Sequence, residues 1–365
     1  MCLPVLPLEK YFGQLELVYE FYGAMPTGLT VSETGRIFVC FPKWGDDVPY
    51  TVAELVDDRL QAYPNIEVNL DGQGDMAASF ISVQSVVADG LGTLWVLDTA
   101  SPNFSPPKIG GAKLVAVDLE MNTISKVYTF AEDVVLPTTY LNDVRFDFRV
   151  GKAGFAYITD SASEGPGAII VVDLDSGAAF RRLNGAPSTT PDPYFLPKVE
   201  GKVLMNRRED GSTSPLSMSA DGIAISPDGK KLFYCPLTSR HLYSISTKAL
   251  RDRTIPDEEL SYHVEYWGEK GASDGMITDA KGAIYAGDYE NNSIRKIEPD
   301  GRIVTIAHDP RILWADTLSI GPDQYLYVIV NQLHRQARFH YGRDLRQKPY
   351  SLLRIRVDEL PAPAS

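Results

Sequence analysis

The sequence predicts an all-β protein, a single six-bladed β-propeller of four-stranded antiparallel blades. Three observations support this fold: one two-strand phrase occurs six times, further strand-like runs follow most copies, and long amphipathic helix patterns are missing. The 365 residues include 25 prolines and 29 glycines, which suit a chain with many turns. Four short strands per repeat are typical of a propeller blade.

Each copy of the repeat is predicted to form a β-hairpin. A polar residue, often followed by glycine, opens an alternating apolar run, and a turn then leads to a second apolar run. The stretch "DGIAISPDGKKLFYCP" (221–236) shows the pattern most clearly. Between the third and fourth copies we expect an insertion at about residues 186–219. The six copies begin at Thr27, Gln84, Asn142, Asp221, Asp274 and Asp316.

Third and fourth strands follow most copies, as in "KLVAVDLE" (113–120) and "TISKVYTF" (123–130). The last blade lacks a fourth strand, because the chain nearly ends after the run at 351–358. We expect "LELVYEFYG" (15–23) to supply that strand, since pairing would cover an exposed sheet edge and close the ring. The chain is therefore predicted to be one domain over residues 1–365.

Composition and charge exclude several classes of partner. Lys and Arg total 35 against 48 for Asp and Glu, so the formal net charge is −13, which opposes binding to nucleic acid or anionic lipid. We expect no nucleotide or redox cofactor, because no glycine-rich phosphate loop is found. The apolar runs are too short for a membrane span. The opening residues lack a basic region and carry prolines, so we expect no signal peptide in this chain. No feature identifies a protein partner.

The three cysteines are Cys2, Cys40 and Cys235, without metal-ligand spacing. Cys40 and Cys235 hold equivalent places in the first and fourth copies, which lie on opposite sides of a six-bladed ring. A disulfide needs Cα atoms within about 7 Å. We therefore predict that both are reduced thiols.

The first residue of each copy begins the strand that lines the central channel, so six polar side chains should gather at one mouth. Buried like charges repel, and a hard cation relieves this, with Ca²⁺ favoured and Mg²⁺ as the alternative. In another interpretation, each acid caps a turn or bonds to a neighbouring blade, and water fills the channel. The metal-ligand candidates are Asn142, Asp221 and Asp274, then Gln84 and Asp316, and last Thr27.

Loops that follow the second strand of each copy should surround the same mouth. They mix aromatic and polar side chains, as small-molecule pockets do, although ordinary solvated loops are the alternative. His241 and His334 lie in these loops and are the candidates for a general base. The ligand-binding candidates are Trp44, Asp46, Asn103, Phe104, Glu164, Arg240, Tyr289, Asn291 and Asn331.

Three stretches carry a family resemblance: "PTGLTVSETGRIFVCFPKWGDDVPYTVAEL", "SVQSVVADGLGTLWVLDT" and "LWADTLSIGPDQYLYVIVNQL". From about residue 15 to 357, the sequence resembles the major royal jelly protein/Yellow family in its bacterial branch. The resemblance implies a six-bladed propeller that binds a small molecule. Some members bind amines or sterols, and some are reported to speed dopachrome conversion. It also implies a secreted or periplasmic protein, with the cytoplasm as the alternative.

A more distant resemblance is to the regucalcin/gluconolactonase, strictosidine-synthase and paraoxonase-like propellers. In those families, Asn and Asp at the channel mouth hold a divalent cation over which a lactone or ester is hydrolysed. "LNDVRFD" with Asn142, "DGIAIS" with Asp221 and "SDGMITD" with Asp274 are similar to those ligand motifs, whereas Thr27 replaces a glutamate. Two functions follow: small-molecule binding without turnover, or metal-dependent lactone/ester hydrolysis.

Overall fold

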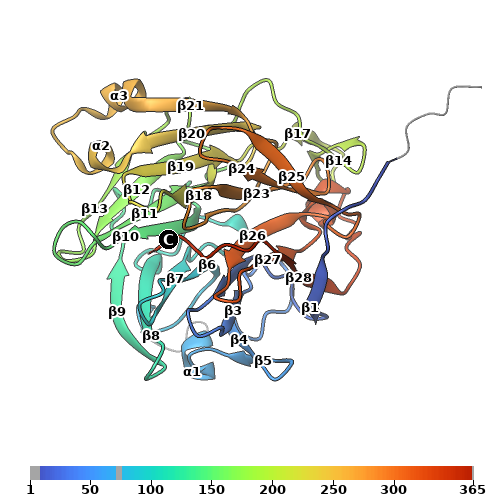
Figure 1. The fold of residues 1–365 in the computed structure, drawn as a ribbon, viewed down its shortest axis with the longest axis horizontal. Coiled ribbons are helices and arrows are strands. Elements are labelled where there is room, and N and C mark those ends of the chain that lie inside the picture. The colour runs from blue at the N-terminus through green and yellow to red at the C-terminus, as the bar shows by residue number, and fades with distance from the viewer. Residues whose placement is uncertain (1–8, 71–75, 364–365) are drawn as a thin grey trace, which may run out of the picture.

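Six four-stranded antiparallel sheets surround a central channel in the computed structural model, which describes residues 9–70 and 76–363 (Figure 1). The first three sheets in chain order each come from one continuous segment. Their strands are β2 (Gly28–Val31), β3 (Ile37–Cys40), β4 (Val52–Val56) and β5 (Arg59–Ala62); β6 (Val83–Ala88), β7 (Thr93–Asp98), β8 (Lys113–Asp118) and β9 (Thr123–Thr129); and β10 (Leu141–Asp147), β11 (Phe155–Asp160), β12 (Ala168–Asp173) and β13 (Ala179–Arg182).

The other three sheets complete the circle. Their strands are β18 (Ala220–Ile225), β19 (Lys231–Pro236), β20 (His241–Ser246) and β21 (Val264–Glu269); β22 (Met276–Thr278), β23 (Ile284–Asp288), β24 (Ser293–Ile297) and β25 (Ile303–His308); and β26 (Ala315–Ile320), β27 (Tyr325–Val330), β28 (Tyr350–Arg356) and β1 (Glu16–Phe21). Short helical turns occur at α1 (Ile66–Asn69), η1 (Pro102–Phe104), α2 (Thr247–Arg251), α3 (Asp257–Leu260) and η2 (Ser261–His263).

The first strands of the sheets form the wall of the channel. Strand β2 contacts β6 and β26, β10 contacts β6 and β18, and β22 contacts β18 and β26, so the contacts run once around the ring. The predicted six-bladed propeller is confirmed.

Closure of the ring joins the two ends of the chain. Strand β1 pairs antiparallel with β28, from Glu16 opposite Arg354 to Phe21 opposite Tyr350. Phe21 is buried in the same apolar cluster as Leu352. The predicted closure by an N-terminal strand is also confirmed, and burial of an aromatic ring explains why a strand so far away in sequence binds here.

Close approach of neighbouring blades explains the repeated Asp-Gly pair. A Cβ atom placed on Gly222 would lie 2.2 Å from the carbonyl oxygen of Asp274, and one on Gly275 would lie 2.6 Å from that of Asp316. Neither separation is sterically allowed. The glycine therefore lets the start of one channel strand touch the next.

An aspartate at the end of the second strand fixes the segment that leads into the first. Asp98 accepts hydrogen bonds from the backbone N–H groups of Ile81 (2.7 Å) and Ser82 (2.9 Å). Asp160 does the same for Tyr140 (2.9 Å). These carboxylates hold the residues just before the channel strands in place.

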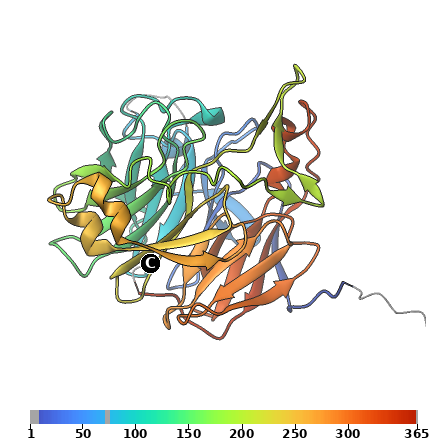
Figure 2. The ribbon, with the colours of Figure 1, turned by 90° about the horizontal axis from the view of Figure 1, so that it is seen from above.

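The predicted insertion at 186–219 contains two small hairpins. They are β14 (Lys198–Val199) with β15 (Lys202–Val203), and β16 (Met205–Arg207) with β17 (Thr213–Pro215). They lie beside the 3-10 turns η3 (Leu333–Arg335) and η4 (Ala337–Phe339), as Figure 2 shows, and the Tyr341 N–H donates to the Arg207 carbonyl at 3.0 Å. We call these four hairpin strands with η3 and η4 the cap.

Cys40 and Cys235 are buried free thiols, as predicted, and burial raises the pKa of Cys40. Cys2 lies outside the described residues. Within the described ranges, no helix is long and apolar enough to cross a membrane.

Candidate functional site

Three aspartates meet at one end of the channel, which we call the acid end. Asp221, Asp274 and Asp316 begin the channel strands of blades four, five and six, and their exposed fractions are 4%, 7% and 3%. Burial, and after it the charge of Asp274, raises the pKa of both Asp221 and Asp316. Within the described part of the chain, none forms an ion pair with Lys, Arg or His.

A fixed donor holds one oxygen of each carboxyl group. The Ser161 hydroxyl donates to Asp221 Oδ2 (2.8 Å), and the Trp314 indole N–H donates to Asp274 Oδ2 (2.8 Å). The Asn331 amide donates to Asp316 Oδ2. These bonds come from three different loops and fix the orientation of all three acids.

The second carboxylate oxygen of Asp221 has no such donor among the described residues. Its Oδ1 atom is buried and has no hydrogen-bond partner among the described residues. Burial, and then the neighbouring Asp274, raise the pKa of Asp221 well above its ordinary value, and the same two causes act on Asp316. Burial also raises the pKa of Asp274. The acid end can therefore take up either protons or a cation.

An aromatic wall stands on the amide side of the same mouth. Tyr140 donates its hydroxyl hydrogen to Gln84 Oε1 (3.0 Å) and accepts from the Trp44 indole N–H (2.8 Å). Phe104 stacks on both rings, with centroids 4.8 Å from Trp44 and 4.7 Å from Tyr140. Asn142 is buried beside them, and its side chain makes no hydrogen bond to the described residues.

Thr27 is the remaining member of the predicted ring of six polar residues, and its side chain contacts residues of the channel wall. Its hydroxyl lies 3.4 Å from the Gln84 carbonyl oxygen and 3.9 Å from the Cys40 sulfur. These contacts are of the kind expected for a purely structural threonine.

The cap covers the acid end through Trp314. This ring stacks on Tyr289 with centroids 4.2 Å apart and lies 6.0 Å from His334. His334 Nε2 lies 2.8 Å from a carboxylate oxygen of Glu200 in the cap. Burial lowers the pKa of His334 to about 4, so the imidazole is neutral at physiological pH. Its Nδ1 atom is buried without a hydrogen-bond partner among the described residues.

Only one of the two predicted histidines comes near the acid end. His241 instead lies on β20, where it contacts Tyr243 and Tyr266 and sits 3.9 Å from Glu269. None of these partners belongs to the acid end.

The predicted ligand-binding residues divide in the same way. Trp44, Phe104, Tyr289 and Asn331 gather around the acid end. The others have partners elsewhere or point outward. Asp46 pairs with Arg346 (2.8 Å), and Arg240 pairs with Glu290 (2.6 Å). The Asn291 amide donates to Asp288 (2.9 Å), the Asn103 backbone N–H donates to the Lys43 carbonyl (2.8 Å), and Glu164 is exposed.

Sequence reasoning missed Tyr140, Trp314, Ser161 and Arg338. A signal existed for two of them, because Tyr140 and Trp314 each lie two residues before the first residue of a repeat copy. Arg338 gave no such signal. Its guanidinium lies 4.7 Å from the Phe104 centroid and 4.6 Å from that of Phe339, and burial lowers its pKa to about 10.

Comparison with known proteins identifies the family to which the chain belongs. The family model described as "Major royal jelly protein" matches residues 81–364. The chain belongs to the major royal jelly protein family. Among curated relatives, "Protein yellow" of Drosophila erecta is 27% identical over 257 residues, which cover 66% of this chain and 44% of that protein. "Protein yellow" of Drosophila madeirensis is 28% identical over 254 residues, with 66% and 42% covered. This royal jelly family chain thus spans less than half the length of these relatives.

Solved structures share the propeller fold of this family member at low sequence identity. A luciferin-regenerating enzyme has a TM-score of 0.58 and 13% identity, covering 97% of this chain and 99% of that one. A gluconolactonase from Xanthomonas campestris has a TM-score of 0.56 and 12% sequence identity, and the match covers 94% of this chain and 89% of that one. A calcium-binding regucalcin from Agrobacterium tumefaciens has a TM-score of 0.50 and 14% sequence identity, and the match covers 95% of this chain and 97% of that one. At such identities the likeness shows the fold alone.

Proposed function

We propose that this protein binds a small molecule with a positively charged group at the acid end of the channel, beneath the cap. One observation carries the proposal: among the described residues, three buried carboxyl groups meet without an ion-pair partner, and no donor group bonds to the buried Asp221 Oδ1. Membership of the royal jelly family supports it, because the resemblance to that family implies small-molecule binding.

The chemistry of the mouth suits an organic ammonium ion. Without a ligand, burial and then the neighbouring Asp274 raise the pKa values of Asp221 and Asp316, which favours their protonated forms. An ammonium group would replace those protons with an ion pair, which is strong where water is excluded. The half-buried ring of Trp44 can contact the apolar part of the ligand.

Calorimetry on the complete chain tests the proposal with two matched probes. Tyramine carries an aromatic ring and an ammonium group, and 4-ethylphenol is the same molecule without the charge. We expect saturable tyramine binding and at least tenfold weaker binding of 4-ethylphenol, since a buried charge pair contributes more than about 1.4 kcal/mol.

Two variants locate the binding site. Asp221→Asn should weaken tyramine binding by tenfold or more, because the amide keeps the shape and loses the charge. Asp228→Asn, in an exposed turn, is the matched control and should leave affinity unchanged. If neither probe binds the wild-type protein, or if Asp221→Asn binds tyramine as tightly as the wild type, the proposal fails.

A second candidate is a metal-dependent lactone or ester hydrolase. The unpartnered Asn142 amide beside three acids favours it, since Ca²⁺ prefers carboxylate and amide oxygens. Against it, the described residues contain no group of three or more His, Cys, Asp or Glu side chains arranged to hold a metal ion. Asn142, Asp221 and Asp274, with Gln84 and Asp316 as further ligands, would hold the ion, which would polarise a carbonyl. Neutral His334, rather than His241, would then be placed to accept a proton.

Titration with Ca²⁺ and Mg²⁺ separates the two candidates. Divalent-ion binding that chelator reverses, together with lactone hydrolysis lost in Asp221→Ala, would favour the hydrolase. Tyramine binding that chelator leaves unchanged would favour the metal-free binder. Export from the cytoplasm remains a prediction from the family resemblance.

A further inference from the structure

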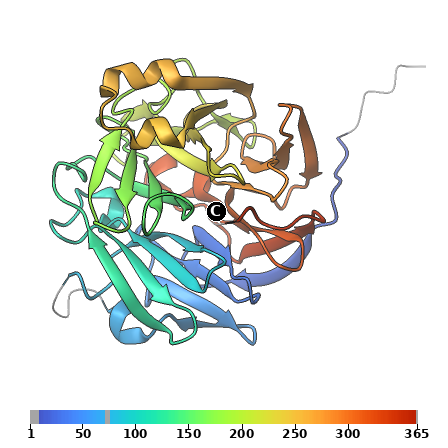
Figure 3. The same cartoon turned by 60° about the vertical axis from the view of Figure 1, so that its left-hand side comes forward.

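A cavity opens at the end of the channel opposite the acid end, where the first strands finish. Its volume is about 330 Å³, and the turns after β2, β6 and β26 line it together with the C-terminal segment 360–363. That segment bonds to blade five, since the Leu360 carbonyl accepts from the Ala280 N–H (2.8 Å) and the Ala362 N–H donates to the Thr278 carbonyl (3.0 Å). In Figures 1 and 3 the C-terminal end accordingly lies near the centre of the ring.

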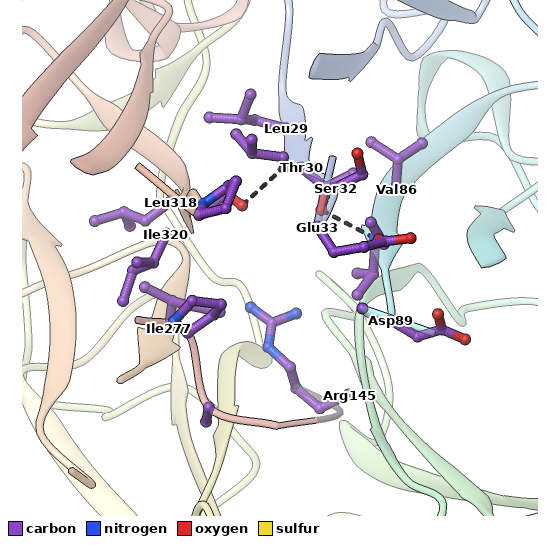
Figure 4. A pocket seen from close by; sticks show the side chains of 18 of the residues that line it. Leu29, Thr30, Ser32, Glu33, Val86, Asp89, Arg145, Ile277, Leu318 and Ile320 are labelled. Atoms are coloured by element: carbon purple, nitrogen blue, oxygen red, sulfur yellow. Dashed lines mark hydrogen bonds between the residues drawn. The ribbon is translucent and has the colours of Figure 1, made fainter. Parts of the chain in front are cut away.

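The wall of this cavity is mostly apolar. Figure 4 shows side chains from different blades facing one opening: Leu29, Val86, Ile277, Leu318 and Ile320. Hydrogen bonds satisfy the polar groups between them, because Thr30 Oγ1 accepts from the Ala88 N–H (2.9 Å) and Ser319 Oγ accepts from the Val31 N–H (3.0 Å). These two hydroxyl oxygens therefore have backbone partners and do not depend on water.

One charged side chain reaches into the cavity. Arg145 is 3% exposed, and Figure 4 shows it extending between the apolar walls. It donates to Asp143 Oδ1 (3.0 Å), to the Val144 carbonyl (2.7 Å) and, across the channel, to the Met276 carbonyl (2.6 Å). Its Nε atom is buried and has no hydrogen-bond partner among the described residues. A buried N–H donor without an acceptor is costly, and a ligand oxygen would satisfy it.

The charges around the cavity favour a neutral ligand. Asp143 already compensates the charge of Arg145. The carboxylates of Glu33 and Asp89 lie among the lining residues, and the chain as a whole carries a formal charge of −13. These carboxylates would repel an anionic ligand, and the Arg145 guanidinium would repel a cationic one.

We propose that this cavity binds a neutral, largely apolar molecule whose single carbonyl or hydroxyl oxygen accepts a hydrogen bond from Arg145 Nε. This site is separate from the acid end, because Arg145 and Asp143 lie across the channel between the two. The proposal does not depend on the function proposed for the acid end.

Fluorescence titration with prodan tests it. This dye is a neutral naphthalene ketone with one carbonyl, and its emission shifts to shorter wavelength in apolar surroundings. We expect saturable binding to the complete chain with such a shift. Arg145→Lys keeps a cation beside Asp143 but removes the Nε donor, and should weaken binding about three- to tenfold.

A pair of leucines on opposite faces provides the matched control. Leu360, 48% exposed, lines the cavity, whereas Leu345, 41% exposed, follows the cap at the other end. Leu360→Asp should weaken prodan binding by tenfold or more, and Leu345→Asp should leave it unchanged. Because both side chains are half exposed, neither change should prevent folding, which thermal melting verifies. No saturable binding to the wild type, equal affinity in Leu360→Asp, or equal weakening by Leu345→Asp would each overturn the proposal.

Discussion

At the scale of single residues, Asp221 is the most unusual side chain of the acid end. One of its oxygens accepts a hydrogen bond from the Ser161 hydroxyl, whereas the other is buried and receives none from the described residues. Because burial and Asp274 raise its pKa in the folded state, the protonated form contributes stability at low pH. That contribution is lost as the pH rises from the ordinary aspartate pKa through the folded-state pKa, at up to about 1.4 kcal/mol per pH unit.

Replacing Asp221 by Asn should therefore stabilise the protein without ligand, increasingly as the pH rises. We expect the difference in Tm between Asp221→Asn and the wild type to grow between pH 4 and pH 8 in buffer with chelator, measured by thermal melting. Asp228→Asn should show no such gain, since the Ser226 hydroxyl lowers the pKa of Asp228 to about 2. A difference in Tm that does not change with pH would contradict the interpretation of Asp221.

Prediction from sequence reached some residues of the acid end and not others. Asp221, Asp274 and Asp316 were found because each opens a repeat copy, and the repeat fixes its place in the ring. Ser161 could not be found this way, because its contact with Asp221 joins neighbouring blades through a loop. Asp46 was misleading for the opposite reason, since its Arg346 partner lies far away in the sequence.

At the scale of elements, Glu200 joins the two segments of the chain that form the cap. Glu200 bonds both His334 (2.8 Å) and Arg335 (2.9 Å), and so fastens the first cap hairpin to η3. These bonds lower the pKa of Glu200 to about 2, with the Arg335 hydrogen bond as the largest cause. The attachment therefore persists above the ordinary glutamate pKa and weakens as the pH falls toward 2.

Glu200→Gln should loosen the cap without unfolding the blades. We expect trypsin to cleave several-fold faster after Lys202, Arg207 and Arg208, with little change in Tm, measured by timed digestion and mass spectrometry. The control is Glu265→Gln on β21, which breaks the exposed ion pair between Glu265 and Lys231 of β19. It should leave these cleavage rates unchanged. Equal cleavage rates in Glu200→Gln and the wild type would show that the cap is held by other contacts.

Elements with regular patterns were predictable, and the cap was not. The hairpin of β18 and β19 follows from alternating apolar residues and a Pro-Asp-Gly turn, which are local signals. By contrast, β14 and β15 are only two residues long and have no periodicity. They are ordered by contacts with η3, more than one hundred residues away in the chain.

At the scale of the whole molecule, the ring depends on one non-covalent joint. Among the described strands, only β1 and β28 bring together segments from the two ends of the chain within one blade. Before β1, the Phe12 and His308 backbones also pair, at 3.0 and 2.9 Å. Both contacts attach the N-terminal segment to the last blades, so the closed ring has a seam at this point.

Deleting residues 1–24 should open that seam. The β28 edge and its apolar neighbours would be exposed, and loss of Phe21 alone costs roughly 3–5 kcal/mol. We expect a lower Tm and a broader unfolding transition by calorimetry, whereas deleting residues 1–8 leaves β1 in place and should change little. An unchanged melting curve after removal of 1–24 would mean that the ring does not need β1.

The antiparallel pairing of β1 with β28 also sets how the molecule responds to mechanical force. Glu16 lies opposite Arg354, so the outward ends of both strands are at the same end of the pair. Tension applied between the two termini would first detach the 360–363 segment and Phe12 from blade five, and would then load the β1–β28 bonds one at a time, from Glu16 toward Phe21. Bonds broken in succession resist less than bonds sheared together. A protein pulled by its ends should therefore open like a zip at the seam, at low force, before any single blade unravels.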